Sequence, residues 1–249
     1  MSNRWLVVLV ACLVVGCAAA EDDFDRLIRM NKASVVMLDE IGLLPAELAS
    51  DIARAIETME TEQREPGAQR SRDYLLFEAR LRQLAGRESS RLHTGRSRQD
   101  IGSTNRRLMI RQRFLEVFPA MLEARQALLE LAGEHGETVL PGYTHGVPAQ
   151  PTTFGHYLLG FAGALERDTA RLEEAYSRLN RSPYGAAVLG TSGFKLDRRR
   201  LAELLGFGGV VENAFDANLV SSVDSKLELA SLLEISAVPV GLFVQDVHT

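Results

Sequence analysis

Three long stretches of helical periodicity constrain what this chain can fold into. Apolar residues recur every three or four positions across residues 103–134, 151–180 and 216–249. A helix of about 30 residues is about 45 Å long, and a compact monomer of 249 residues rarely contains three such rods. No alternating strand pattern and no repeat of fixed period follows residue 20. The sequence therefore predicts an all-α protein, an elongated bundle of long helices that forms oligomers.

A small N-terminal helical domain is expected over residues 21–102, before a central long-helix bundle domain over residues 103–249. Apolar spacing predicts its helices at residues 27–41, 45–59 and 73–85. Asp73 is a suitable cap for the third of them, which Gly86 would end. In the bundle domain, Pro239 is expected to kink the last helix or to unsettle its final turns.

The first twenty residues have the pattern of a secretory signal peptide. Arg4 precedes eleven consecutive apolar residues, and small residues then lead to an acidic stop at residues 21–23. The segment Val14-Val15-Gly16-Cys17 also resembles a lipobox, in which a lipidated Cys17 would anchor the chain to a membrane. A periplasmic or membrane-anchored protein is therefore expected; the alternatives are an apolar N-terminal strand and a cytoplasmic location. Both cysteines lie in this segment, so the processed chain has no internal disulfide.

Charge and motif content exclude several classes of function. The formal net charge is −5, with 28 basic and 33 acidic residues, which gives no electrostatic reason to expect nucleic acid. The five histidines show no metal-binding spacing, so no metal site is expected. The sequence contains no phosphate loop, no dinucleotide fingerprint and no nucleophile elbow.

The first loop that carries chemistry is the polar segment of residues 91–100, which has no helical period. It contains three arginines, two hydroxyls, an amide and a carboxylate, and a helix is predicted to follow it. Arginine forks and hydroxyls beside a helix N-terminus suit a substrate with several carboxylates. The alternative is a solvated loop with surface ion pairs. The candidate binding residues here are Thr94, Arg96, Ser97, Arg98 and Gln99.

The second loop spans residues 140–151 and is expected to end at Pro151, where a helix would begin. Its glycines and prolines impose an unusual path around Thr144 and His145. His145 could transfer protons near neutral pH, and Thr144 could anchor a carboxylate. Alternatively, His145 only caps a helix or bonds a backbone carbonyl.

Together these loops resemble the argininosuccinate lyase branch of the fumarase/aspartase superfamily. The family pattern L-H-T-G-R-S-R-N-D reads L-H-T-G-R-S-R-Q-D over residues 92–100. The pattern P-G-Y-T-H-L-Q-x-A-Q-P reads P-G-Y-T-H-G-V-P-A-Q-P over residues 141–151. The glycine-rich segment of residues 183–191 and the segment Asn213-Ala-Phe-Asp-Ala217 follow in the family's order.

The resemblance implies a mostly helical homotetramer that uses no cofactor and builds each active site from loops of three subunits. The reaction implied is a β-elimination that cleaves a C–N bond and releases fumarate, with arginine as the other product when argininosuccinate is the substrate. The resemblance also implies that His145 is the acid/base partner and that Thr144, the other residue of the catalytic pair, binds substrate. Ser97, Arg98 and Gln99 would form the substrate loop, and Thr94, Arg96 and Gln150 belong to the same motifs.

Departures from the family pattern leave other functions open. Gln99 replaces asparagine, Gly146-Val147 replaces leucine-glutamine, and Val220-Ser221-Ser222 stands where the family has D-R-D. The family's G-S-S-x-M-P-x-K-x-N loop, whose serine is the usual base, is not found in these residues. The alternatives are therefore a related lyase for another N-substituted succinate, and a catalytically inactive fragment or binding protein.

Overall fold

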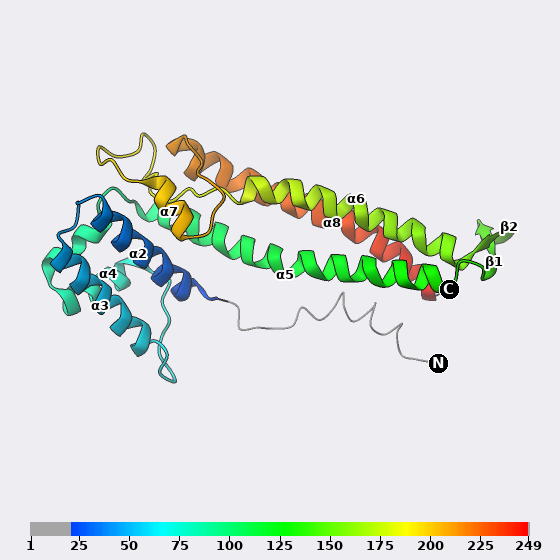
Figure 1. Ribbon diagram of the computed structural model, residues 1–249, viewed down its shortest axis with the longest axis horizontal. Coiled ribbons are helices and arrows are strands. Elements are labelled where there is room, and N and C mark those ends of the chain that lie inside the picture. Colours follow the sequence, from blue (N-terminus) through cyan, green and yellow to red (C-terminus); the bar gives the residue numbers. More distant parts are fainter. Residues whose placement is uncertain (1–20, 249) are drawn as a thin grey trace. The chain divides into compact units, whose positions relative to one another are not determined.

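The computed structural model describes residues 21–248, and the predicted leader and Cys17 lie outside that range. The described chain divides into two compact units (Figure 1). The N-terminal unit comprises residues 21–112 and 177–225, and the bundle unit comprises residues 113–176 and 226–248. Three long helices have residues in both units.

Short helices with well-defined caps build the N-terminal unit. They are α2 (Asp23–Glu40), α3 (Ala46–Glu62), α4 (Tyr74–Ala85), the 3₁₀ helix η1 (Arg87–His93) and α7 (Arg198–Leu204). Asp22 forms a capping box with Asp25 at the start of α2, and the Asp73 side chain accepts the Leu75 N–H at the start of α4. The three helices predicted for this unit are therefore confirmed within a residue or two at most ends, with a start four residues earlier for the first.

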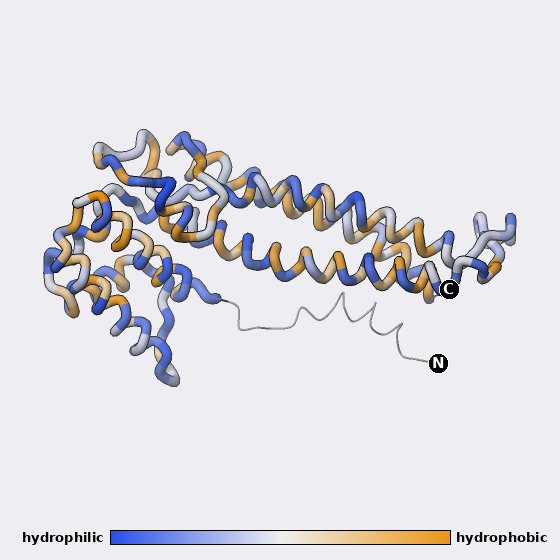
Figure 2. The backbone as a smooth tube through the Cα atoms, in the orientation of Figure 1, coloured by the Kyte–Doolittle hydropathy of each residue, from blue (hydrophilic) through white to orange (hydrophobic). Residues whose placement is uncertain are grey.

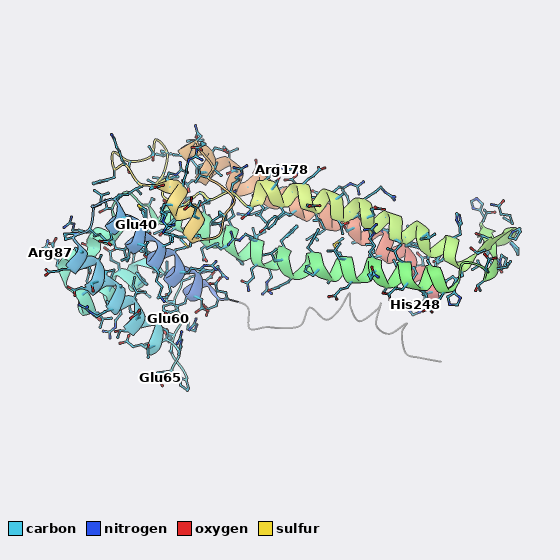
Figure 3. The ribbon with its side chains drawn as sticks, viewed as in Figure 1. Glu40, Glu60, Glu65, Arg87, Arg178 and His248 are labelled. Carbon is cyan, nitrogen blue, oxygen red and sulfur yellow. The ribbon has the colours of Figure 1, made fainter. Side chains whose placement is uncertain are left out.

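The core of the N-terminal unit brings distant parts of the sequence together. Apolar side chains of α2, α3 and α4 pack with others from α5 and α7, including the fully buried Ile52, Ile56, Leu81, Leu108 and Leu201. At the surface, Glu40 at the end of α2 (labelled in Figure 3) pairs with Arg200 of α7 at 2.9 Å. This pair is exposed and contributes little to stability.

Three long helices supply the bundle unit: α5 (Arg98–Glu134), α6 (Phe154–Leu179) and α8 (Ser221–His248), which the π-helix η2 (Asp216–Val220) precedes. Their parts within this unit share one apolar core, formed by Leu128, Leu158 and Leu165 with Phe243 packed against it. The all-α prediction is confirmed. Helix α8 runs through Pro239 to His248, so the proline does not end it.

Many apolar side chains of α8 remain exposed. They include Val223, Leu227, Ile235, Val238 and Leu242. Figure 2 colours the backbone of the chain by the hydropathy of each residue. The helical segment Asp216–His248 is long and apolar enough to cross a membrane by length and composition, and 11% of its most apolar window is buried. The same property suits a helix that other protein chains cover.

A β-hairpin replaces the second predicted loop. Strand β1 (Val139–Thr144) pairs antiparallel with β2 (Val147–Thr153), so the expectation of no strands is wrong in this segment. Each strand of a two-stranded sheet has an open edge, which tolerates prolines. Helix α6 begins at Phe154, three residues after the predicted Pro151, because Pro151 pairs with Pro141 in the hairpin.

Candidate functional site

The end of the first predicted loop forms the N-terminus of α5, which starts five residues earlier than expected. The Ser97 hydroxyl accepts the Gln99 N–H at 3.2 Å, and the Asp100 carboxylate accepts the Ser97 N–H at 2.9 Å. These reciprocal bonds satisfy two backbone donors and start the helix. Arg98 is exposed, while Ser97 and Gln99 are partly exposed. The predicted binding residues Ser97, Arg98 and Gln99 are thus accessible at the positive end of a long helix dipole.

The Arg96 side chain is buried inside the N-terminal unit, unlike the exposed or partly exposed side chains of the three residues that follow it. Its guanidinium donates to Asn31, Ser34 and Tyr184 through one nitrogen and to Tyr74 through another. The side chain is buried, and its partners come from α2, α4 and the glycine-rich segment. Burial raises the pKa of Tyr74 to about 12 and also raises that of Tyr184, so both phenols stay protonated at neutral pH. Arg96 was predicted to bind substrate; its contacts here are with its own chain.

Asp100 is the second buried charge of this motif. One carboxylate oxygen accepts the N–H groups of Gly185 and Ala187, each at 3.0 Å, while the other accepts that of Ser97. Burial raises the pKa of Asp100 to about 6, although the backbone donors and the charge of Arg96 oppose the shift. The carboxylate therefore holds the start of α5 against the glycine-rich segment.

Gln99 contacts a further residue that the sequence did not single out. Its Nε2 donates to the backbone carbonyl of Asn218 at 3.3 Å, and Asn218 Nδ2 donates to the carbonyl of Ala187 at 2.9 Å. Asn218 lies in the π-helix η2, a type of structure common at functional sites. The preceding Asn213–Ala217 motif was the only signal for this region.

Two other residues of the first loop have local roles in the structure. The Thr94 hydroxyl donates to the carbonyl of Arg91 at 2.6 Å, which closes the turn after η1. His93 stacks on Tyr74 with ring centroids 4.7 Å apart. Burial, together with the positive charges of Arg96 and Arg98, lowers the pKa of His93 to about 4, so its imidazole is neutral at pH 7.

Thr144, His145 and Gln150 lie on the hairpin of the bundle unit, and all three are exposed. Positive φ angles at His145 (53°) and Gly146 (73°) form the two-residue turn, the pattern of a type I′ turn. This geometry displays His145 at the tip of the hairpin. Thr144 pairs with Val147 across it, and Gln150 pairs with Gly142.

No residue set in the described part of the chain suits a metal ion. Among residues 21–248 there is no group of three or more His, Cys, Asp or Glu side chains that could hold one. The candidate residues of the N-terminal unit instead carry hydroxyl, amide and guanidinium groups, and those of the hairpin carry a hydroxyl, an amide and one exposed imidazole.

The structure combines long packed helices with two polar features. One is the cluster of hydroxyl, arginine and amide side chains at the start of α5, and the other is the hairpin before α6, which carries a threonine and a histidine. This combination is that of helical-bundle proteins of the fumarase/aspartase type. Residues 33–249 match the profile of a family described as lyase, and the chain belongs to that family.

Relatives with similar sequences carry the name argininosuccinate lyase. The protein of Natronomonas pharaonis is 43% identical over 200 residues, which are 80% of this chain and 41% of that one. The protein of Geobacillus thermodenitrificans is 40% identical over 234 residues, 92% of this chain and 50% of that one. The chain thus spans about half the length of the curated relatives that it matches.

Solved structures of two lyases are similar to this fold. A crystal structure described as EDDS lyase in complex with formate matches with a TM-score of 0.85 and 29% identity, covering 99% of this chain and 48% of that one. The fumarate lyase from Mesorhizobium sp. BNC1 matches with a TM-score of 0.73 and 25% identity, covering 92% of this chain and 55% of that one.

Proposed function

We propose that this chain is part of a lyase that cleaves a C–N bond by β-elimination and releases fumarate, with argininosuccinate as the substrate. The observation that carries the proposal is the presentation of Ser97, Arg98 and Gln99 at the start of α5, in a chain whose relatives are named argininosuccinate lyase. A hydroxyl, a guanidinium and an amide at a helix N-terminus are donors that suit a carboxylate.

The elimination needs those donors at one carboxylate of the substrate. A base removes a proton from the carbon beside that carboxylate, and negative charge spreads into its oxygens. The electron pair then forms the C=C bond of fumarate while the C–N bond breaks and the amine takes up a proton. Donors fixed in place before the reaction stabilise the charged intermediate by several kcal/mol. In this scheme Ser97 and Arg98 bind the succinyl group, Thr144 anchors it and His145 exchanges the proton.

We further propose that the working form is a homotetramer that binds a small dicarboxylate, with no nucleic acid and no cofactor. The hairpin of one copy would supply Thr144, His145 and Gln150 to the substrate loop of another. The exposed apolar side chains of α8 support association, because a helix surface of this kind is costly to leave in water. We also propose export through residues 1–20, which a mature mass lower by about twenty residues would test.

The contact between Gln99 and Asn218 favours a second candidate substrate. A glutamine reaches one methylene further than the family's asparagine, and here its amide already donates to the Asn218 carbonyl. An amide displaced by about 1 Å can change a rate by about 100-fold. A lyase for another N-substituted succinate is therefore the alternative, and a binding protein without turnover is the outcome if no substrate reacts.

Fumarate formation by the purified full-length chain tests these proposals. Argininosuccinate and a panel of other N-substituted aspartates would be supplied, and fumarate would be followed by its ultraviolet absorbance. We expect His145→Ala to lower the rate by about 100-fold or more, whereas His156→Ala, another exposed histidine of the bundle unit, should not change it. Absence of fumarate with every substrate would overturn the proposed activity, and a preferred substrate other than argininosuccinate would select the alternative.

A further inference from the structure

We propose that Asp100 is the positioning residue of the substrate loop: its buried carboxylate fixes Ser97 and the glycine-rich segment of residues 183–191 to one another, so that Ser97 and Gln99 face substrate in a single arrangement. The proposal rests on the proposed function, because it assigns the means by which that site keeps its geometry. Asp100 itself is fully buried, so we assign it a positioning role and no contact with substrate.

Three backbone donors converge on this carboxylate from two segments that are 85 residues apart. Oδ1 accepts the N–H of Ser97, and Oδ2 accepts those of Gly185 and Ala187. Within residues 21–248, Asp100 forms no ion pair with a basic side chain, and the cations whose charges act on it are Arg96 and Arg198. The carboxylate therefore serves as an acceptor of backbone N–H groups rather than as half of a salt bridge.

A second chain of bonds closes the arrangement through Asn218. Asn218 Nδ2 donates to the carbonyl of Ala187, and the Gln99 amide donates to the backbone carbonyl of Asn218. Gln99 in turn donates its N–H to Ser97. Each residue of this ring is bonded to the next, so displacement of the glycine-rich segment would move both Ser97 and Gln99.

The glycine-rich segment needs such restraint because its backbone is strained. Ala187 and Leu189 have φ angles of 54° and 53°, which residues with a Cβ seldom adopt. Conformations of this kind persist only where surrounding bonds over-determine them. The bonds from Asp100 and Asn218 to both peptide groups of Ala187 provide that restraint.

Only a carboxylate satisfies all three donors. An asparagine at position 100 has one acceptor oxygen, and its NH₂ group would face a backbone N–H on the other side. The variant Asp100→Asn keeps the volume but must break the bond to Ser97 or the bonds to the glycine-rich segment. The matched control is Asp197→Asn, because Asp197 accepts one N–H, that of Arg200, at an exposed helix cap where asparagine serves equally well.

The experiment measures fumarate affinity and backbone hydrogen exchange in the full-length wild type, Asp100→Asn and Asp197→Asn, with folding checked by circular dichroism. In Asp100→Asn we expect fumarate affinity to fall at least about tenfold, and kcat with the best substrate to fall by more than KM rises, about 100-fold in kcat/KM. The amides of Ser97, Gly185 and Ala187 should exchange faster. If Asp100→Asn does not fold, a second variant, Asn218→Ala, replaces it in the test. This variant should also weaken fumarate binding.

The outcomes separate this inference from the proposed function. A wild-type chain that neither binds fumarate nor forms it would overturn the proposed function, and with it any positioning role. A wild-type chain that binds fumarate, with a folded Asp100→Asn variant that binds and turns over equally well, would overturn the role of Asp100 alone. Equal losses in Asp197→Asn would show a general effect of removing acidic charge and would also contradict the inference.

Discussion

Removal of one buried hydroxyl tests whether the hydrogen bonds around Arg96 stabilise the N-terminal unit. Tyr184 is fully buried, and its hydroxyl accepts a hydrogen bond from Arg96 and lies 2.9 Å from the Ser34 hydroxyl. It also donates to the carbonyl of Met30 at 3.3 Å. The variant Tyr184→Phe removes these bonds and leaves the aromatic ring in place.

The expected loss of free energy of unfolding depends on which hydrogen bonds of Tyr184 are removed and on which bonds its partners keep. A hydrogen bond to a charged group contributes about 1.5–3 kcal/mol, and one between neutral groups contributes about 1 kcal/mol. Arg96 keeps its bonds to Asn31 and Ser34 through the same nitrogen, and the ring stays within 5.9 Å of the guanidinium. We therefore expect the free energy of unfolding to fall by about 2–3 kcal/mol, less than the sum of about 3.5–5 kcal/mol for the three bonds of Tyr184.

Urea unfolding followed by circular dichroism measures this difference. The control is Tyr143→Phe, because Tyr143 is 62% exposed on the hairpin. That change should alter the free energy of unfolding by less than about 0.5 kcal/mol. If the two variants differ by less than that amount, the buried bonds of Tyr184 do not stabilise the fold and the reasoning fails.

Three further predictions concern the same unit. Gly95→Ala should destabilise by about 1–3 kcal/mol more than Gly67→Ala in urea unfolding, because both have positive φ but only at Gly95 would a Cβ lie 2.7 Å from Leu196. The pKa of His93 is lowered to about 4, so its contribution to the free energy of unfolding is complete above pH 6.5 and is lost as the pH falls through 4. The variant His93→Gln should therefore reduce this dependence of stability on pH. The raised pKa of Asp100, about 6, has the opposite sign: its contribution is full below pH 3.8 and lost as the pH rises through 6, and Asp100→Asn should remove this decline.

Helix positions were predictable because local patterns determine them. The apolar spacing of α2, α3 and α4 and the cap at Asp73 are properties of neighbouring residues. The hairpin was missed because prolines and glycines dilute any strand alternation, and because its turn uses His145 where asparagine or aspartate is usual. The hydrogen bonds that pair the two strands join backbone groups, so they require no particular side-chain pattern.

Side-chain direction in the first loop was not predictable from the sequence. Arg96, Ser97, Arg98, Gln99 and Asp100 are all polar, yet the two end residues are buried and the three central ones are at least partly exposed. The buried partners of Arg96 are 22 to 88 residues away, on α2, α4 and the glycine-rich segment. Gly185 and Ala187, which donate to Asp100, are more than 80 residues away from it. No local pattern records such contacts.

The two halves of the proposed site therefore differ in how their geometry is maintained. The substrate loop is held at both ends by buried charges, Arg96 and Asp100, each with several hydrogen bonds to its own chain. His145 is held only by the turn of an exposed hairpin whose residues 143–151 are all accessible in this chain. Catalytic groups must be positioned to within about 0.5 Å. In the proposed site, hydrogen bonds within one chain fix Ser97 and Gln99, whereas the role proposed for His145 calls for contacts from another copy. The proposed assembly would therefore do more than cover apolar surface.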